Sequence, residues 1–345
     1  MTEKQWNQLV EVVEGKYSGP PVSAFIIDSP WLPGWHGISN LSYYNSEEAW
    51  FKANMAAVNE FPEAIFLPGF WSEYGMCTEP SAFGAKLIWL EGNLPHADKI
   101  ISSNEQINDL QIPNVKTDGL LPFMLHRLVS MEPRINKEGH LLKFAVARGP
   151  LNIASFLMGT SELMMMMMLE PETTHKLLEI ITQFTINWLQ LQNESLKDVE
   201  AILILDDIVG FIGQPEVEAF AVPYIKRIFE SFETKVRLFH NDAQGLVSTP
   251  YLKEMGVNLF NFSFEHSINE IRKLAGSEVA LLGNIPPRDV LSAGTPDEVK
   301  EYTNKMFTET QDKKRILWSC GGGMPPDVSS DNINAFLSEI QYLGR

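Results

Sequence analysis

Short apolar runs recur along the chain, and each one ends in polar or glycine-containing residues. Eight of them are rich in Val, Ile, Leu and Phe, and they span residues 22–27, 64–67, 142–147, 201–205, 236–239, 257–260, 279–282 and 315–318. Runs in which apolar and polar positions do not alternate are typical of strands buried on both faces, as in a parallel sheet. The pattern therefore predicts eight buried parallel strands.

Helical patterns separate these runs. Segments 171–196, 215–233 and 295–310 place apolar residues at helical spacing, and Thr295 followed by Pro296 is a favourable helix start. Eight strands alternating with helices predict an α/β fold of the (β/α)8 or TIM barrel type. An open, doubly wound sheet is the alternative. It is disfavoured because no G-x-G-x-x-G motif follows the early runs and the sequence holds no P-loop.

Length and composition narrow the class of protein further. A chain of 345 residues with 44% hydrophobic residues fits one barrel domain over 1–345, with a helical and loop extension over about 1–60. The net charge of −17 argues against a nucleic-acid partner. Only two cysteines and no apolar signal core or membrane-length run are present, so we expect a cytoplasmic protein that does not enter a membrane.

Metal-ligating residue types stand where two of the predicted strands end, the edge at which barrels carry their chemistry. His240 and Asp242 lie two residues apart, so both side chains can face the barrel axis. Cys320 ends the last run, and three glycines after it let the backbone approach a ligand closely. Imidazole, carboxylate and thiolate are zinc ligands, and three of them with an open position indicate catalytic zinc. The alternative is a hydrogen-bonded histidine and an inert cysteine.

Two aromatic-rich segments, 28–37 and 69–84, are candidate loops above the barrel. The first contains Trp31 and Trp35, and the second places Glu79 among aromatic side chains. A carboxyl group near aromatic rings can have a raised pKa and act as an acid. Aromatic loops above a barrel can line an apolar pocket, or they can simply cover the barrel top.

Several segments resemble the uroporphyrinogen decarboxylase superfamily. They span residues 144–160, 204–212, 239–243, 281–302 and 319–336, and the resemblance covers roughly residues 50–345. The resemblance implies a (β/α)8 barrel, which agrees with the strand count. It also implies one of two chemistries, which are cofactor-free decarboxylation of the acetate arms of uroporphyrinogen and cobamide-dependent methyl transfer, usually assisted by zinc.

The chain departs from the decarboxylases at two places. Those enzymes carry an arginine-rich N-terminal segment that binds carboxylates, whereas residues 23–37 contain no arginine. They also place a catalytic Asp before an A-x-G segment after the second strand, where this chain has Cys77, Glu79 and the segment 82–84. An eight-carboxylate substrate would suit neither this loop nor an acidic chain. Decarboxylase activity is therefore the less favoured interpretation.

The cobamide-dependent methyltransferase branch fits better. Its thiol-methylating members hold zinc with His-x-Cys and a later Cys, whereas this chain has His240, Asp242 and Cys320. Replacing one thiolate with a carboxylate makes zinc harder and better suited to an oxygen ligand. The resemblance therefore implies methyl transfer from an aryl methyl ether to the Co(I) corrinoid of a partner protein. A D-x-H-x-x-G corrinoid-binding motif is absent from the sequence.

An aryl ether needs a Lewis acid or a proton on its oxygen, because phenolate is a poor leaving group. The zinc could supply the first, and Glu79 or Asp207 the second. The aromatic side chains expected to hold a flat ring are Trp31, Trp35, Phe70, Trp71, Tyr74, Phe211, Phe262 and Phe264. The alternatives are methyl transfer from a methylated corrinoid protein to tetrahydrofolate or a thiol, decarboxylation, and ligand binding without turnover. The particular methoxyarene, the direction of transfer, the fourth metal ligand and the oligomeric state stay open.

Overall fold

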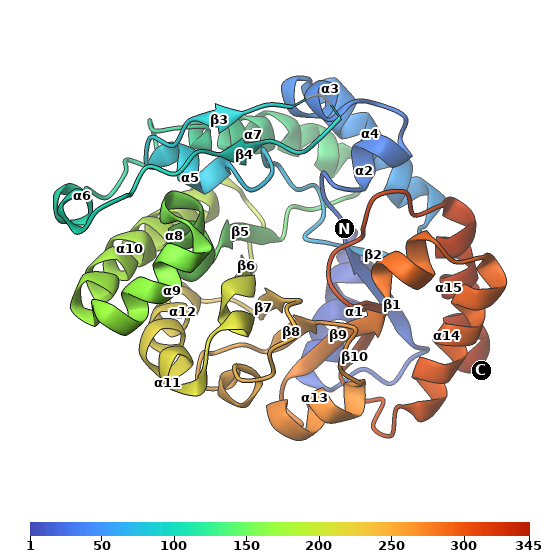
Figure 1. Cartoon of the computed structure of the whole chain (residues 1–345). Helices are drawn as coiled ribbons and strands as arrows, with labels where there is room; N and C mark the ends of the chain where they lie inside the picture. The colour runs from blue at the N-terminus through green and yellow to red at the C-terminus, as the bar shows by residue number, and fades with distance from the viewer. Residues whose placement is uncertain (91) are drawn as a thin grey trace.

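The computed structural model describes residues 1–90 and 92–345, and its centre is an eight-stranded sheet surrounded by helices (Figure 1). All neighbouring strands run parallel, in the order β2-β1-β10-β9-β8-β7-β6-β5. The strands are β1 Val22–Ile26, β2 Ile65–Leu67, β5 Phe144–Arg148, β6 Ala201–Leu205, β7 Val236–Asn241, β8 Leu259–Phe262, β9 Ala280–Ile285 and β10 Ile316–Cys320. Each of the eight apolar runs overlaps one of these strands, so the strand prediction is confirmed.

Helices connect the strands and cover the outside of the sheet (Figure 1). They are α1 Glu3–Glu14, α2 Leu32–Trp35, α3 Asn40–Asn45, α4 Glu47–Glu60, α5 Thr78–Ala82, α6 Asn104–Asp109, α7 Leu121–Lys137, α8 Pro150–Met158, α9 Thr160–Leu169, α10 Pro171–Ser195, α11 Gln214–Glu216, α12 Val222–Phe229, α13 Ile268–Ala275, α14 Pro296–Glu309 and α15 Ser330–Leu343. A small antiparallel pair, β3 Leu87–Ile88 and β4 His96–Ala97, lies outside the main sheet.

The predicted helices are confirmed with one difference. Segments 171–196 and 295–310 form α10 and α14, and Thr295 caps α14 with a reciprocal capping box to Glu298. Segment 215–233 instead divides into α11, a π-helical turn over Val217–Ala221, and α12. Pro223, in the first turn of α12, has no N–H to donate, so the regular ladder is interrupted there.

Two apolar layers account for the burial of both strand faces. Alternate residues such as Ile26, Leu203 and Leu238 pack together inside the curled sheet, where Trp6 and Leu9 of α1 join them. The intervening residues face the surrounding helices and belong to a second, larger cluster. The continuous apolar runs follow from this arrangement, because a strand that is buried on both faces has few positions left for polar side chains.

The sheet has a seam between β2 and β5, the two ends of the strand order. No hydrogen-bonded ladder joins these strands within the described residues. The Gln192 side chain of α10 fills the place of a partner at β5, because its amide oxygen accepts from Val146 N and its nitrogen donates to Val146 O, both at 3.0 Å. The structure thus confirms an α/β fold with eight parallel strands that curl around an inner core, and the hydrogen bonding stops at this seam.

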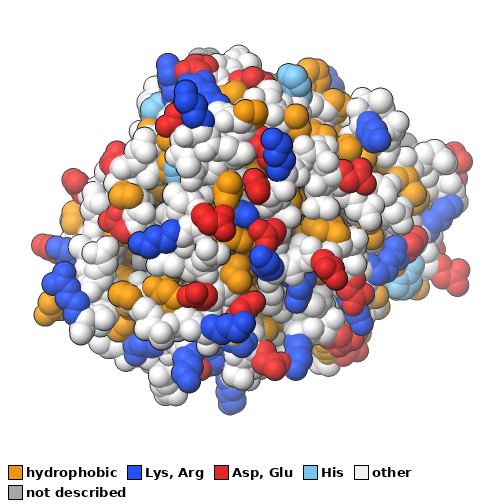
Figure 2. Space-filling view, turned by 180° about the vertical axis from the view of Figure 1, so that it is seen from behind, with side chains coloured by type: hydrophobic (Ala, Val, Ile, Leu, Met, Phe, Trp, Pro, Cys, Tyr) orange, Lys and Arg blue, Asp and Glu red, His pale blue; other side chains and the backbone are white. Residues whose placement is uncertain are grey.

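Two further properties of the molecule are the charge on one of its faces and the length of its apolar helices. On the face seen in Figure 2, Lys and Arg side chains are interspersed with Asp and Glu. In the described part of the chain, no single helix is long and apolar enough to cross a membrane. Only α8 and α9 taken together pass that test, and the two helices are bent by 109° relative to each other.

Candidate active site

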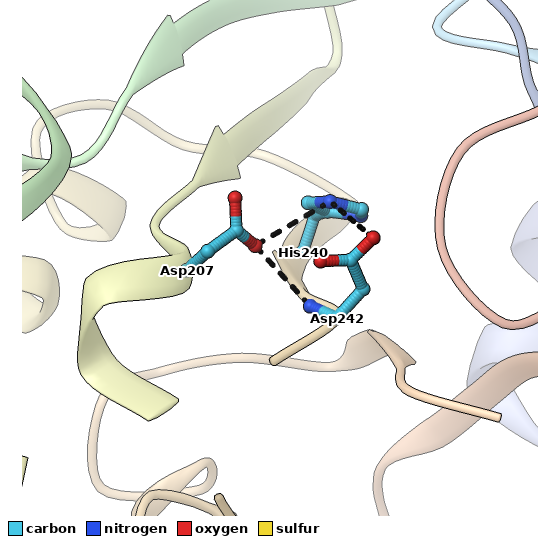
Figure 3. A group of neighbouring side chains, drawn as sticks. All are labelled: Asp207, His240 and Asp242. Atoms are coloured by element: carbon cyan, nitrogen blue, oxygen red, sulfur yellow. Dashed lines mark hydrogen bonds and ion pairs between the residues drawn. The ribbon is translucent and has the colours of Figure 1, made fainter. Parts of the chain in front are cut away.

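Asp207, His240 and Asp242 meet at the carboxyl ends of the neighbouring strands β6 and β7 (Figure 3). The Nε2 atom of His240 lies 3.6 Å from Asp207 Oδ1 and 3.9 Å from Asp242 Oδ2. One potential ligand atom from each residue lies within 4.8 Å of the others. We call these three residues the acid–histidine group. The sequence paired His240 with Asp242 and proposed Asp207 only as an acid, whereas the structure brings all three together.

The end of β6 explains why Asp207 is available to this group. The preceding residue, Asp206, is fully buried and accepts hydrogen bonds from Leu151 N at 2.9 Å and Asn152 N at 3.0 Å. These donors belong to the first turn of α8, where the helix dipole favours a negative charge. Burial nevertheless raises the pKa of Asp206 well above its usual range. Asp206 thus positions α8, while Asp207 contacts the other two members of the group.

A neighbouring asparagine fixes the imidazole of His240. His240 Nδ1 lies 2.7 Å from Asn261 Oδ1, and Asn261 Nδ2 donates to Leu282 O at 2.8 Å. Because the amide nitrogen faces a carbonyl, the amide oxygen is the acceptor and Nδ1 must carry the hydrogen. This assignment leaves the lone pair of Nε2 directed toward Asp207 and Asp242, as in histidines that bind metals. The sequence search did not single out Asn261.

The two carboxylates of the group lack a cationic partner of their own. Their side chains are 36% and 45% exposed for Asp207 and Asp242, and no Lys or Arg forms an ion pair with either within the described residues. Burial and the Asp242 charge raise the pKa of Asp207, although His240 opposes the shift. Asp242 N also donates to Asp207 Oδ1 at 3.2 Å. A cation would relieve the repulsion between these carboxylates.

The donor set fits zinc in identity and spacing. Bonds of about 2.0–2.2 Å to imidazole nitrogen and carboxylate oxygen place neighbouring ligands of a tetrahedral zinc about 3.4 Å apart. The separations of 3.6 and 3.9 Å around His240 Nε2 are only slightly larger. Three protein ligands would leave one position for another group, as catalytic zinc sites do. The group is therefore compatible with a metal site.

Cys320 and the glycines after it lie close to Asp242, although Cys320 is outside the three-residue group. Cys320 is fully buried at the end of β10, its thiol lies 3.6 Å from Gly322 O, and burial raises the pKa of the thiol to about 12. The thiol is not a member of the acid–histidine group. At Gly322, with φ of +99°, a Cβ atom would lie 2.5 Å from Asp242 Oδ2. The glycines thus allow close approach to Asp242, and the role of Cys320 as a third metal ligand stays a prediction.

Glu79 lies in a second group of charges, which we call the Arg148 cluster and which consists of Arg148, Glu73 and Glu79. Glu79 accepts from Arg148 N at 3.0 Å and from Arg148 Nη1 at 3.4 Å. Glu73 accepts from Arg148 Nη2 at 3.1 Å and from Ser29 Oγ at 2.7 Å. All three charged side chains are at most 8% exposed. The cluster links the segment after β2 to the end of β5 across the seam, and the sequence did not reveal this pairing.

The aromatic residues proposed to bind substrate divide by exposure. Trp31, Phe70, Trp71 and Phe262 are buried, and Trp35 and Tyr74 are partly buried. Phe211 and Phe264 are 61% and 38% exposed. These two follow β6 and β8, so they flank the segment that carries His240 and Asp242. Phe211 and Phe264 are therefore the members of the set best placed to meet a ligand from solution.

Comparison with known proteins identifies the family. The model of the family "Uroporphyrinogen decarboxylase (URO-D)" matches residues 35–342. The uroporphyrinogen decarboxylase of Chloroherpeton thalassium is 27% identical over 274 residues, which cover 76% of this chain and 75% of that protein. The uroporphyrinogen decarboxylase of Xylella fastidiosa is 22% identical over 282 residues and 77% of each chain.

Solved structures show the same fold. A methyltransferase from Methanosarcina mazei superposes with a TM-score of 0.79 at 16% identity, covering 97% of both chains. A B12-independent methionine synthase from Shewanella sp. W3-18-1 superposes with a TM-score of 0.54 at 12% identity, covering 94% of this chain and 96% of that one. At these identities the likeness concerns the fold, whereas the family match covers most of the sequence. The chain belongs to the uroporphyrinogen decarboxylase family.

Proposed function

We propose that this protein is a corrinoid-protein-dependent methyltransferase that moves the methyl group of an aryl methyl ether to the Co(I) corrinoid of a partner protein. The observation that carries this proposal is the acid–histidine group, which offers one imidazole nitrogen and two carboxylates at the carboxyl edge of the sheet. An oxygen-rich donor set favours a hard Lewis acid and an oxygen-containing substrate. The fold shared with a methyltransferase from Methanosarcina mazei is consistent with this assignment.

Each residue of the acid–histidine group would supply one ligand atom to a metal ion. His240 would bind zinc through Nε2, and Asp207 and Asp242 would each supply an oxygen, with Cys320 as a further candidate ligand. When bound, zinc would supply a Lewis acid for the ether oxygen. Asn261 would hold the imidazole in the required tautomer through its 2.7 Å contact with Nδ1. Loss of either Asp207 or Asp242 would leave the other ligands too few for tight binding.

The substrate and the partner must both reach the same edge of the sheet. Phe211 and Phe264 are exposed beside the group and would contact the aromatic ring of the substrate. The partner protein would have to bring its corrinoid to the methyl carbon of the bound ether, so it would dock at this edge over the substrate. Exclusion of water by that docking would strengthen the electrostatic effects of the charged side chains.

Two alternatives make different demands on the site. Methyl transfer from a methylated corrinoid protein to a thiol or to tetrahydrofolate would need a thiolate-binding metal or a pterin site. Decarboxylation is favoured by the names of curated relatives. However, Arg148 already binds Glu73 and Glu79, and Asp207 and Asp242 form no ion pair with a Lys or Arg in the described residues. These negative charges would oppose a substrate with eight carboxylates.

Methyl transfer to a reduced corrinoid protein tests the proposal. The protein is incubated with a Co(I) corrinoid protein and a panel of methoxyarenes, and formation of methyl-Co(III) is followed by absorbance. We expect turnover with at least one ether and loss of turnover in His240→Ala. His36→Ala is the matched control, because His36 is a partly buried histidine with no side-chain hydrogen bond in the described part of the chain. Activity only from methyl-Co(III) to tetrahydrofolate or a thiol would contradict the proposed direction.

A further inference from the structure

Asp28 lies just after the carboxyl end of β1 and close to the Arg148 cluster, but its side chain has no bonded partner in the described residues. Its carboxyl group makes no hydrogen bond or ion pair within the described residues, and the residue is only partly buried. Glu73 and Arg148 act on it electrostatically from the segment after β2 and from β5, and Tyr43 and Tyr44 face it from α3. Ile26, two residues before Asp28, pairs with Gly323, and a Cβ atom at the preceding Gly322 would lie 2.5 Å from Asp242 Oδ2. Asp28 is thus an unpartnered acid beside the segment that contacts the acid–histidine group.

The charge balance of its surroundings favours the protonated form of Asp28. Arg148 donates to both Glu73 and Glu79, so these two carboxylates already exceed the single guanidinium by one negative charge. An ionised Asp28 would add a second excess negative charge beside these carboxylates. Burial and the Glu73 charge raise the pKa of Asp28 well above its usual range, and Arg148 opposes the shift only in part.

The other candidate acids are already engaged. Glu79 accepts two hydrogen bonds from Arg148. Asp207 belongs to the acid–histidine group, where its Oδ1 atom lies 3.6 Å from His240 Nε2. Both carboxyl groups therefore already have a positively charged or imidazole partner within the protein. Asp28 differs from both because no cation or donor contacts its oxygens in the described part of the chain.

Building on the proposed function, we propose that Asp28 is the catalytic acid that protonates the oxygen leaving the methyl group of the aryl ether. The proton passes from the Asp28 carboxyl group to the ether oxygen while the bond between that oxygen and the methyl carbon breaks. The electron pair of this bond stays on oxygen, giving a neutral phenol. The new bond to the methyl carbon uses the electron pair of the Co(I) corrinoid, which becomes methyl-Co(III). Asp28 regains its proton from water afterwards.

The dependence on leaving group tests this assignment. Wild type and Asp28→Asn are compared with a reduced corrinoid protein and a series of para-substituted anisoles whose phenols differ in acidity. Asn is nearly isosteric with Asp and removes no side-chain hydrogen bond here, so the variant should fold. We expect a loss of about 10²–10⁴-fold in kcat for ethers of weakly acidic phenols, shrinking toward no loss for strongly acidic ones. A purely structural role would lower kcat by the same factor across the series.

A spectroscopic measurement complements the kinetics. The infrared absorption of protonated carboxylic acids at neutral pH should be weaker in Asp28→Asn than in wild type by the contribution of one group, whether or not a substrate is added. Absence of that difference, or a uniform kinetic loss in an active enzyme, would overturn the role of Asp28 alone. A wild type inactive with every ether but active in another methyl transfer would overturn the proposed function and this role together.

Discussion

Two groups of charged side chains stand at the carboxyl ends of the strands, and they are built in opposite ways. In the Arg148 cluster both carboxylates are buried and bonded to one guanidinium. In the acid–histidine group both carboxylates are partly exposed and face the Nε2 atom of His240, with no Lys or Arg ion-paired to them in the described residues. The first group is satisfied within the protein, whereas the second lacks a cation. The contrast supports our proposal that the second group binds a cation, because the charges of the first group already have partners within the protein.

The two groups also differ in the strand pairing around them. The Arg148 cluster joins two segments across the seam, where no strand ladder exists between β2 and β5 in the described residues. The acid–histidine group lies where β6 and β7 are fully paired, up to Leu205 and His240. Ion pairs thus join the two edges where backbone hydrogen bonds are missing, while the fully paired part of the sheet carries the acid–histidine group.

Removing the cation of the Arg148 cluster should have the largest effect on stability. Arg148→Met leaves Glu73 and Glu79 buried without a counter-charge, so the free energy of unfolding should fall by about 3–5 kcal/mol. Urea denaturation measures it. Lys235→Met is the control, because Lys235 is 55% exposed in its ion pair with Glu200 and should change stability by about 1 kcal/mol at most. Similar losses in the two variants would remove the structural role of the cluster.

A change behind the acid–histidine group should lower its affinity for zinc. Asn261→Ala removes the acceptor that fixes His240 Nδ1, so zinc affinity should fall by roughly 10–100-fold. Isothermal titration with zinc measures this. Asn261→Asp keeps an acceptor oxygen at the same position and should retain more of the affinity. Equal affinities in wild type and Asn261→Ala would show that the imidazole is not oriented through this contact.

Asp28 adjoins the Arg148 cluster but, like the carboxylates of the acid–histidine group, has no Lys or Arg bonded to it in the described residues. Replacing it should raise stability and lower activity. Because the pKa of Asp28 is raised in the folded protein, its contribution to stability is fully present below the ordinary pKa of 3.8 and is lost as pH rises through the folded-state pKa. At pH 7 the folded protein keeps the Asp28 proton that the unfolded chain releases, and this difference lowers the free energy of unfolding. Asp28→Asn removes the difference, so it should stabilise the protein at pH 7 by about 0.5–2 kcal/mol while lowering turnover. The gain should shrink as pH falls toward 3.8. Thermal unfolding between pH 4 and 7 checks the trend, and a pH-independent difference would contradict it.

The sequence predicted more of the fold than of the site. Continuous apolar runs marked all eight strands because strands buried on both faces leave few polar positions. The seam could not be predicted, since it depends on Gln192 of α10 occupying the place of a strand. At the site, the spacing of His240 and Asp242 was informative because both end the same strand. The partner of Glu79 could not be predicted, because Arg148 lies 69 residues away in the sequence and only the folded chain brings the two together.

The metal content of paired variants tests the contrast between the two groups most directly. Wild type, His240→Ala and Glu79→Gln are prepared with zinc, freed of excess metal and analysed by atomic spectrometry. The account predicts about one zinc per chain in wild type and in folded Glu79→Gln, and little or none in His240→Ala. The same zinc content in His240→Ala as in wild type would contradict the assignment of the acid–histidine group as the metal site.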